Sequence, residues 1–478
     1  MDNAALLTDY SGRDFTAGLE RSLTRLRLDC PELTDLNPSD AGVSIIRNTE
    51  RDVDLLNLYL DLAFAESFVR TAKFKQSIIE LAYLVGVQPK LASAAMTLFR
   101  ISRVIQAGGT RNDITIPKYT PFQRSDGLVY LTMDSVFIPA SSDYVDVAAW
   151  QGELVTINIK PEDLQNFDLS VYPKFNLGRN VAARSVTVTN KESLVAWTEV
   201  DSFWRSQPED LHYNLELYGD EIEGETDTVF IVFGNGNKGQ TLPIEGVTVS
   251  FLRTAGASGN CGVNTITTTV GAFAGIVTVS NIELASGGAE AEGTESLRER
   301  LPGAVQLQQT AVSKENYESL LKRIPGVKLC QCVDRNDDLL WPHLYVPLYV
   351  LPEGGGLMST PLKEIILGEL REWGHLGSWD NRYILLDAVA VPINVTCRVN
   401  VSSGVGSTVQ NHVYETILGL FSPGKNRLNG EFDFTDLNMT ASRIAGVNWI
   451  EFDEPKADVS LGIGQYPVPG TITVNVVS

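Results

Sequence analysis

The chain has 478 residues, and the usual size of about 100–200 residues per domain predicts roughly three domains. Its composition, 43% hydrophobic and 20% charged, is typical of a folded protein and argues against extended disorder. A net charge of −21 would repel a phosphate backbone, so nucleic-acid binding is disfavoured; the acidity favours solubility and suits basic patches on partner proteins.

The first fifteen residues have neither a basic n-region nor an apolar h-region, so no secretory signal is expected. No apolar run approaches the roughly 20 residues that span a membrane. We therefore expect a protein that stays in a cytoplasm unless another machine moves it. Five scattered cysteines predict reduced, buried thiols. Cys330 and Cys332 share one face of a predicted strand and are expected in a core, because no second pair completes a zinc site.

Residues 12–90 are predicted to be helical. Ser39 or Asp40 can cap the start of a long helix, because a short polar side chain accepts from its free amides. Steps of seven, three, four and four residues then join one apolar stripe. The stripe consists of Ile46, Val53, Leu56, Leu60 and Phe64. It packs either on its own domain or in a bundle shared with other subunits. A shorter helix is predicted next, ending at Gly86 and Pro89.

Near residue 94 the pattern changes to the alternation of strands. Strands are predicted at 96–101, 128–131, 145–149, 154–159, 186–188, 229–233 and 247–252. Turns rich in Gly, Asn, Asp and Pro separate them. The topology of this β-rich region does not follow from the sequence, and residues 160–225 are the least assigned part.

From about residue 285, helices and strands alternate. Helices are predicted after the acidic stretch 290–299, after Ser313 and at 360–373, with strands at 328–333, 344–350 and 385–401. An echo appears 120 residues on, where the Arg-Ile-x-Gly-Val segment of 323–327 recurs at 443–447. In both, Ile closes an apolar helix face, Gly relieves the turn, and Val begins a strand.

The predicted fold class is therefore α+β and multidomain. A helical region spans residues 1–92 and a β-rich middle spans 93–284. Two tandem α+β modules follow, at 285–390 and 391–478. Such modules expose strand edges and helix faces that suit assembly.

The segment Gly234–Gly239 reads GNGNKG and matches the spacing GxGxxG of dinucleotide-binding loops. Such a loop needs a helix after it, so that the helix amides bind pyrophosphate. Here Pro243 and the alternating stretch 247–251 predict a strand instead. Lys238 is followed by glycine, which also excludes a P-loop. A β-hairpin or loop tip is expected, with no cofactor.

Asp334, Asn336 and Asp338 alternate as in the first half of an EF-hand loop. Leu339 stands where that loop needs glycine, and Tyr345 where it needs a bidentate glutamate. A solvated turn without a metal is expected.

No catalytic set is predicted. Glu290, Glu292 and Glu295 could suggest acid/base chemistry, but nothing local desolvates them, so a solvated helix start is expected. Ser422–Lys425 matches Ser-x-x-Lys, but its Pro and Gly indicate a turn. The histidines fall in no ligand spacing. They are His212, His343, His375 and His412.

Several short segments carry a recognisable order. They are Ala65–Ala72 leading to Leu81–Pro89, Ile116–Phe122, Val232–Asn260 with its spaced glycines, Ser286–Arg298, and Val312–Val327. In this order they resemble the baseplate J-like family, the wedge proteins of contractile phage tails. One departure stands at Thr310–Tyr317, where many relatives carry an "RaVT…Dy" pattern. The arginine is absent here, so no contact of that arginine is carried over.

The resemblance implies a non-enzymatic role without cofactor or metal. Family members pair within each wedge, and the wedges form a ring around the hub that widens when the sheath contracts. It implies as partners a second copy, other wedge proteins, the hub and sheath-initiating proteins, but no nucleic acid and no membrane insertion. N-terminal helices join a bundle, and C-terminal modules mediate contacts between copies. The implied location is the tail baseplate of a virion, assembled in the bacterial cytoplasm.

The residues expected at partner interfaces combine the helical stripe with the two echo segments. They are Ile46, Val53, Leu56, Leu60, Phe64, Ile324, Val327, Ile444 and Val447. Three alternatives remain. A phage-derived injection device would use the same subunit. A glycan-binding or glycan-processing tail component would use aromatics such as Phe203, Trp204 and those at 373–379. A nucleotide-dependent enzyme would rest on the glycine loop alone.

Overall fold

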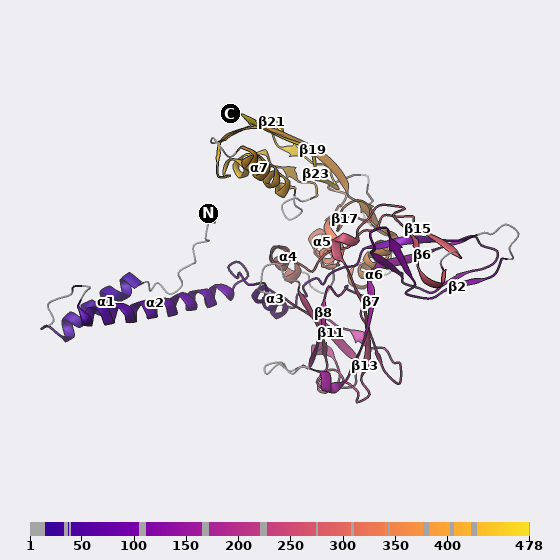
Figure 1. Cartoon of the computed structure of the whole chain (residues 1–478), viewed down its shortest axis with the longest axis horizontal. Helices are drawn as coiled ribbons and strands as arrows, with labels where there is room; N and C mark the ends of the chain where they lie inside the picture. The colour runs from indigo at the N-terminus through magenta and orange to yellow at the C-terminus, as the bar shows by residue number, and fades with distance from the viewer. Residues whose placement is uncertain are drawn as a thin grey trace. The chain divides into compact units, whose positions relative to one another are not determined.

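The structure is a computed structural model of the whole chain (Figure 1). It describes residues 15–32, 37, 40–104, 111–164, 172–219, 227–273, 276–306, 310–339, 341–342, 345–375, 382–401, 406–421 and 428–477. The chain divides into two compact units, one of Met1–Gly86 with Gly219–Glu225 and one of the remaining residues. Helices dominate the first unit and strands the middle of the second, which confirms the predicted α+β class.

The first unit contains three described helices, α1 (Phe15–Asp29), α2 (Ala41–Glu66) and α3 (Lys75–Leu84). Asp40 caps α2 as predicted, since its Oδ1 accepts from the amides of Gly42 at 2.8 Å and Val43 at 3.2 Å. Ser39, the other predicted cap, lies outside the described residues. After α3 the backbone turns at Gly86, where φ is +77°.

Helix α1 lies along α2 as a helical hairpin (Figure 1). The Ser22 hydroxyl donates to the Glu50 carboxylate. The Arg51 guanidinium lies 5.9 Å from the centre of the Phe15 ring. The α2 face that carries Glu50 therefore meets α1.

The middle of the second unit is built on a six-stranded antiparallel sheet in the order β14-β3-β4-β6-β1-β15. Its strands are β1 (Met96–Arg103), β3 (Pro121–Arg124), β4 (Val129–Thr132), β6 (Tyr144–Gln151), β14 (Ile266–Thr269) and β15 (Val277–Asn281). Phe99, Phe122 and Tyr130 are fully buried in its core, with the Phe99 and Phe122 ring centres 5.5 Å apart. β2 (Ile114–Ile116) and β5 (Val136–Ile138) form a separate two-stranded antiparallel sheet.

Two smaller sheets complete the β-rich middle, in the orders β10-β11-β12-β8 and β7-β13-β9. The first contains β8 (Lys174–Arg179), β10 (Thr198–Glu199), β11 (His212–Tyr218) and β12 (Thr228–Phe233). The second contains β7 (Glu153–Ile159), β9 (Thr187–Asn190) and β13 (Val247–Arg253). Residues 160–225 thus supply β8, β10 and β11, which the sequence did not predict.

Two α+β modules follow. The first consists of α4 (Thr294–Gln306), α5 (Lys314–Arg323), β16 (Val327–Cys332), β17 (Val346–Pro352), α6 (Thr360–Trp373) and β18 (Tyr383–Asp387). The second consists of β19 (Val389–Val401), α7 (Gly406–Leu420), β20 (Glu431–Phe432), α8 (Phe434–Ser442), β21 (Val447–Glu454), β22 (Val459–Ser460) and β23 (Gln465–Val477). The single strand predicted at 385–401 is wrong. The chain changes sheets at Ala388, because β18 pairs with β17 and β19 pairs with β21 and β23.

The modules share a sheet plan. In each, a central strand (β17 or β19) has one antiparallel neighbour (β16 or β21) and one parallel neighbour (β18 or β23). The echo segments form the same turn, with φ of +93° at Gly326 and +94° at Gly446. Val327 and Val447 each donate to the isoleucine carbonyl three residues back, at 3.2 Å in both. Glycine is needed here because the left-handed region strains other residues.

Among the helices that the structure describes, none is both long enough and apolar enough to cross a bilayer.

Candidate functional site

In the part of the chain that the structure describes, no group of three His, Cys, Asp or Glu side chains is placed to hold a metal ion. His212 lies on β11, with its Nδ1 2.9 Å from the Ser206 hydroxyl. His343 and Ser422–Lys425 lie outside the described residues.

The glycine loop 234–239 connects β12 to β13, which belong to different sheets, so it is a loop tip and not a hairpin within one sheet. Its amides are already engaged. Those of Asn237 and Lys238 donate to Asn235 Oδ1 at 3.0 Å. The Gly236 amide donates to the Gly239 carbonyl at 3.0 Å. A phosphate cradle needs free amides, so this loop is a self-closed turn.

The aspartate turn at 334–338 is also closed on itself. Asp334 Oδ1 accepts from the amides of Asn336 at 2.8 Å and Asp337 at 3.1 Å. The Lys314 ammonium lies 3.3 Å from Asp334 Oδ2 and 2.9 Å from Asp337 Oδ2. A lysine therefore supplies the positive charge at this turn.

Glu292 corrects the prediction of a solvated acidic helix start. Glu290 and Glu295 are exposed, but Glu292 is buried and accepts from Arg300 Nε at 2.9 Å and Nη2 at 2.7 Å. The Lys90 amide donates to the same carboxylate at 3.0 Å. Burial opposes ionisation of Glu292, but the hydrogen bonds and charge of Arg300, with the charge of Lys90, hold its pKa below the ordinary range.

This buried pair belongs to a larger joint between the middle sheet and the first module. The segment before β1 runs antiparallel to 286–292, through the bridges Ser93–Ala289 and Met96–Ser286. Arg300 Nη2 also donates to the Gln88 carbonyl at 2.8 Å. Lys90 lies 202 positions from Glu292, and Arg300 lies eight positions after it on α4, so no short sequence pattern reveals these partners.

The glycine motifs that carry the family resemblance meet in this joint. Asn260 Nδ2 donates to the Gly288 carbonyl at 2.8 Å, and the Gly288 amide donates back to Asn260 Oδ1 at 2.9 Å. A Cβ on Gly288 would lie 2.5 Å from the Gly256 carbonyl oxygen, and one on Gly326 3.0 Å from that of Gly287. These glycines are needed because the backbones approach too closely for a side chain.

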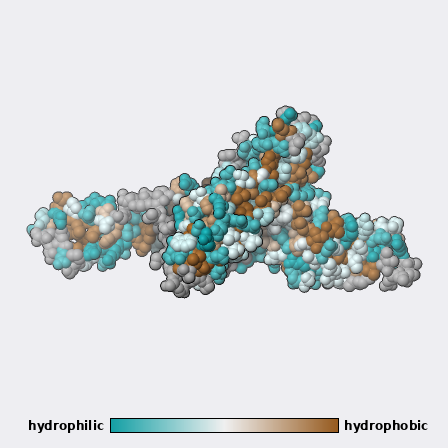
Figure 2. Space-filling model, turned by 90° about the horizontal axis from the view of Figure 1, so that it is seen from above, coloured by the Kyte–Doolittle hydropathy of each residue, from teal (hydrophilic) through white to brown (hydrophobic). Residues whose placement is uncertain are grey.

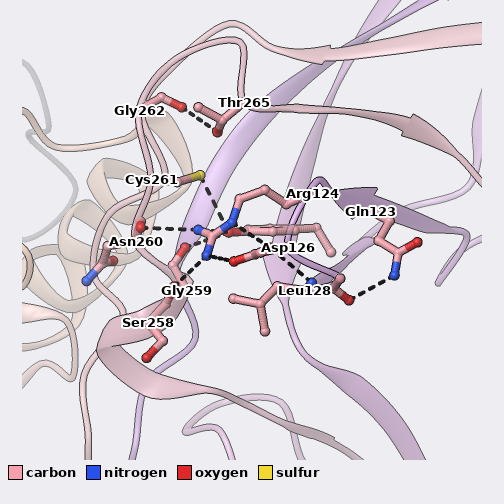
Figure 3. A network of polar contacts seen from close by, with 12 residues as sticks. Gln123, Arg124, Asp126, Leu128, Ser258, Gly259, Asn260, Cys261, Gly262 and Thr265 are labelled. Atoms are coloured by element: carbon pink, nitrogen blue, oxygen red, sulfur yellow. Dashed lines mark hydrogen bonds and ion pairs between the residues drawn. The ribbon is translucent and has the colours of Figure 1, made fainter.

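A polar network fixes the loop of Asn260 to the β3–β4 hairpin (Figure 3). Arg124 pairs with Asp126 at the hairpin turn, and its Nη2 also donates to the Ser258 carbonyl at 3.1 Å. The buried Tyr130 hydroxyl donates to the Gly259 carbonyl at 2.6 Å. Burial raises the pKa of Tyr130, so its hydroxyl keeps the proton that it donates.

The helical stripe is the one set of predicted interface residues that lies largely open. Val53, Leu56, Leu60 and Phe64 are 42%, 65%, 48% and 48% exposed, and Ile46 is half-buried. Ile45 and Tyr59 lie beside Leu56 on the helix surface and are also exposed, and Leu55 and Leu58 are exposed farther around the helix. Figure 2 shows apolar surface on this helical part of the molecule, at the left of the view. The described part of the chain covers α2 mainly on the side of Glu50.

The four echo residues are placed differently from the stripe. Ile324 and Val327 are buried in the core formed by α5, α6, β16 and β17, so they cannot contact a partner while the module is folded. They hold their own module together instead. Ile444 and Val447 are half-buried and pack against the core of the second module.

The aromatic residues considered for sugar stacking do not form a shared platform in the described residues. Phe203 is buried and stacks on Tyr172, with ring centres 4.8 Å apart. Trp204 is exposed, with the Arg205 guanidinium 4.4 Å from its ring centre. Trp373 packs against the core of the first module. Trp379 lies outside the described residues.

Thiol reactivity tests the placement of the cysteines. Cys330 and Cys332 are buried, and burial raises the pKa of each thiol to about 12. Because the thiolate is the reactive form, we expect neither to react with an aromatic disulfide reagent near neutral pH until the protein unfolds. The exposed Cys30 serves as the internal control and should react at once. Mass spectrometry of the labelled peptides measures this, and rapid labelling of Cys330 in the folded protein would contradict the placement.

No family model matches the chain, and no curated protein matches it. Among solved structures it is similar to a chain of the anti-feeding prophage (AFP) baseplate, from a cryo-EM structure that was 6-fold symmetrised. The two are 13% identical, the likeness covers 95% of this chain and 90% of that chain, and the TM-score is 0.30. A TM-score this low does not establish a shared fold. The function of this chain is therefore inferred from its own residues.

Proposed function

We propose that this chain is a structural wedge subunit of the baseplate of a contractile phage tail, or of a phage-derived injection device, and has no catalytic role. The proposal extends to a pair of copies in each wedge, a ring of wedges around the hub, and contacts with other wedge, hub and sheath-initiating proteins. Its location is the virion tail, after assembly in the bacterial cytoplasm. The ordered sequence motifs and the exposed apolar side chains of α2 support this role.

The open apolar face of α2 is the observation that carries the proposal. A helix of 26 residues is about 39 Å long, and here large apolar side chains are exposed along it from Ile45 to Phe64. Soluble monomers rarely leave such a continuous patch in water, because each buried side chain of this size contributes about 1.5–3 kcal/mol. Helices of neighbouring subunits that pack on this face would bury it.

The joint described above supports a mechanical role. Buried charges and glycine contacts connect the middle sheet to the first module, and several of the motif residues take part in this connection. A subunit that moves as part of a ring needs such fixed joints between its modules.

Replacing Leu56 and Leu60 together with aspartate tests the docking face. Both side chains are largely exposed, so the isolated chain should fold with little change in stability. In the assembled state each carboxylate would be buried without a partner, at a cost of several kcal/mol. We expect the variant to be absent from particles purified from cells that produce it in place of the unmodified chain.

The matched control is the pair Leu28→Asp and Leu84→Asp. These leucines are at least as exposed, at 75% and 81%, but lie on α1 and at the end of α3. The control variant should enter particles normally. Normal entry of the Leu56/Leu60 variant would show that α2 is not the docking face.

A further inference from the structure

Helix α1 covers only the first half of α2. Phe15, at the start of α1, lies beside Arg51 in the middle of α2, with 5.9 Å between the guanidinium and the centre of the ring. From there α1 runs back along the first half of α2, and the second half extends past it (Figure 1). The large apolar side chains of the helical stripe that follow Arg51 are the exposed ones. They are Val53, Leu56, Leu60 and Phe64.

The residues that precede Phe15 are attached at the point where these exposed side chains begin. Residues 1–14 lie outside the described residues, and their sequence contains a short apolar run. It consists of Ala4, Ala5, Leu6, Leu7 and Tyr10. The three large members are spaced by one and three residues, a spacing that in a helix gathers them on one face.

This segment is long enough to reach the whole open part of the stripe. From Arg51 to Phe64 there are thirteen steps along α2, which correspond to about 20 Å of helix. Fourteen residues span about 21 Å as a helix and more in an extended conformation. Residues 1–14 therefore reach the far end of the stripe from their attachment at Phe15.

We propose that residues 1–14 fold back onto the open part of the helical stripe in the unassembled chain, and that helices of neighbouring subunits displace them. The inference rests on the proposed function, because it adds a regulation of the same docking face. Leu6, Leu7 and Tyr10 would cover apolar surface that otherwise stays in water until a partner binds. The free chain would thus hide the face that it uses in the particle.

Tethering favours this segment over any other occupant of the face in the free chain. A segment joined to α1 is present beside α2 at an effective concentration on the order of millimolar, whereas another chain must be met in solution. A second copy is further opposed by the net charge of −21 on each chain. Fixing the backbone of the segment costs conformational entropy, so three large apolar side chains hold it weakly. A partner that buries the whole face can then displace it.

Hydrogen exchange of the isolated full-length chain tests the contact. The amides of residues 4–10 should exchange about fivefold more slowly in the unmodified chain than in Leu56→Asp/Leu60→Asp, which removes the face that they cover. Leu28→Asp/Leu84→Asp is the matched control, because it makes the same change at exposed leucines outside the stripe, and it should leave this exchange slow. Exchange of residues 4–10 at one rate in all three chains would overturn the inference.

Changing the segment itself gives the reciprocal test. Leu6→Asp/Leu7→Asp should raise the binding of ANS, a dye that binds exposed apolar surface, about twofold or more. Asn3→Asp/Thr8→Asp is the control, since it adds two carboxylates to the same segment and keeps both leucines. It should bind the dye as the unmodified chain does, and far-UV circular dichroism should be the same for all three. Equal dye binding by the two variants would contradict the proposed cover.

The outcomes also separate this inference from the family role. Protection of residues 53–64 that grows with protein concentration and persists in Leu6→Asp/Leu7→Asp would place a second copy on the stripe and overturn the inference. A chain whose residues 4–10 are protected by α2 but which never enters particles contradicts the baseplate proposal alone. A chain that enters particles through α2 while residues 4–10 exchange freely beforehand contradicts this inference alone.

Discussion

Replacing Arg300 with methionine is expected to lower the free energy of unfolding by about 3–5 kcal/mol, because it leaves the Glu292 carboxylate buried without its main partner. The side chains of Glu292 and Arg300 are only 1% and 7% exposed. The remaining donors to Glu292 are the Lys90 amide and the Ser296 hydroxyl, which do not replace a guanidinium. Urea denaturation of the full-length chain measures the change.

Two further variants separate a buried pair from a general loss of charge. Arg398→Met removes an exposed guanidinium that pairs with Asp453 at 3.0 Å, and it should leave the stability almost unchanged, because solvent screens the pair. The double variant Glu292→Leu/Arg300→Met removes both buried charges and should recover much of the stability lost in Arg300→Met. Equal losses from Arg300→Met and Arg398→Met would contradict the account of the joint.

The same pair has an expected pH dependence. The folded state holds the pKa of Glu292 below its usual value of 4.5, so the unfolded chain takes up this proton first. The stability contributed by Glu292 is therefore present above about pH 4.5 and is lost as the pH falls through the lower, folded pKa. In the double variant this part of the acid sensitivity should disappear.

Gly288→Ala is expected to destabilise the protein by about 1–3 kcal/mol, near the upper end of that range. The added Cβ would lie 2.5 Å from the Gly256 carbonyl oxygen and 3.0 Å from both the Ala95 Cβ and Asn260 Oδ1. The first of these is backbone, so relief requires the two segments to separate and the Asn260 clasp to open. Thermal unfolding followed by circular dichroism measures the effect.

Gly293→Ala is the matched control, because a Cβ there meets nothing within 4 Å and lies five residues along the same segment. It should leave the melting temperature almost unchanged. If Gly288→Ala were as stable as Gly293→Ala, the close approach of the two backbones would not be needed for the fold.

The sequence predicts those elements whose signal is local. Asp40 and Ser313 cap the helices expected to follow them, and α6 spans the predicted residues 360–373. Helix α7 was missed although its signal is present, since Val409, Val413, Ile417 and Leu420 are spaced as one helix face and are all buried.

Other features depend on residues far apart in the chain. Glu292 was expected in solvent because nothing in its local sequence would desolvate it, but the Lys90 amide that binds it lies 202 positions away. Leu385–Val401 is one apolar run in sequence and two strands in space, because pairing partners and not local pattern decide the sheet. β23 was not predicted. Its two prolines are unusual in a strand, but an edge position accommodates them.

The predicted interface residues also divide into those that follow from local sequence and those that do not. The stripe on α2 follows from helical spacing and is where the sequence placed it, although whether partners bind there stays a prediction. The echo segments were expected at interfaces because tandem α+β modules expose strand edges and helix faces that suit assembly. Recurrence instead reflects a shared turn, which buries Ile324 and Val327 in their own core.

Cryo-electron microscopy of the intact particle tests the central claim most directly. The proposed role predicts density for this chain in the baseplate ring, with α2 packed along its Leu56 and Leu60 side against helices of neighbouring subunits. Density confined to a fibre tip, or a ring that lacks this chain, would contradict the role of a wedge subunit.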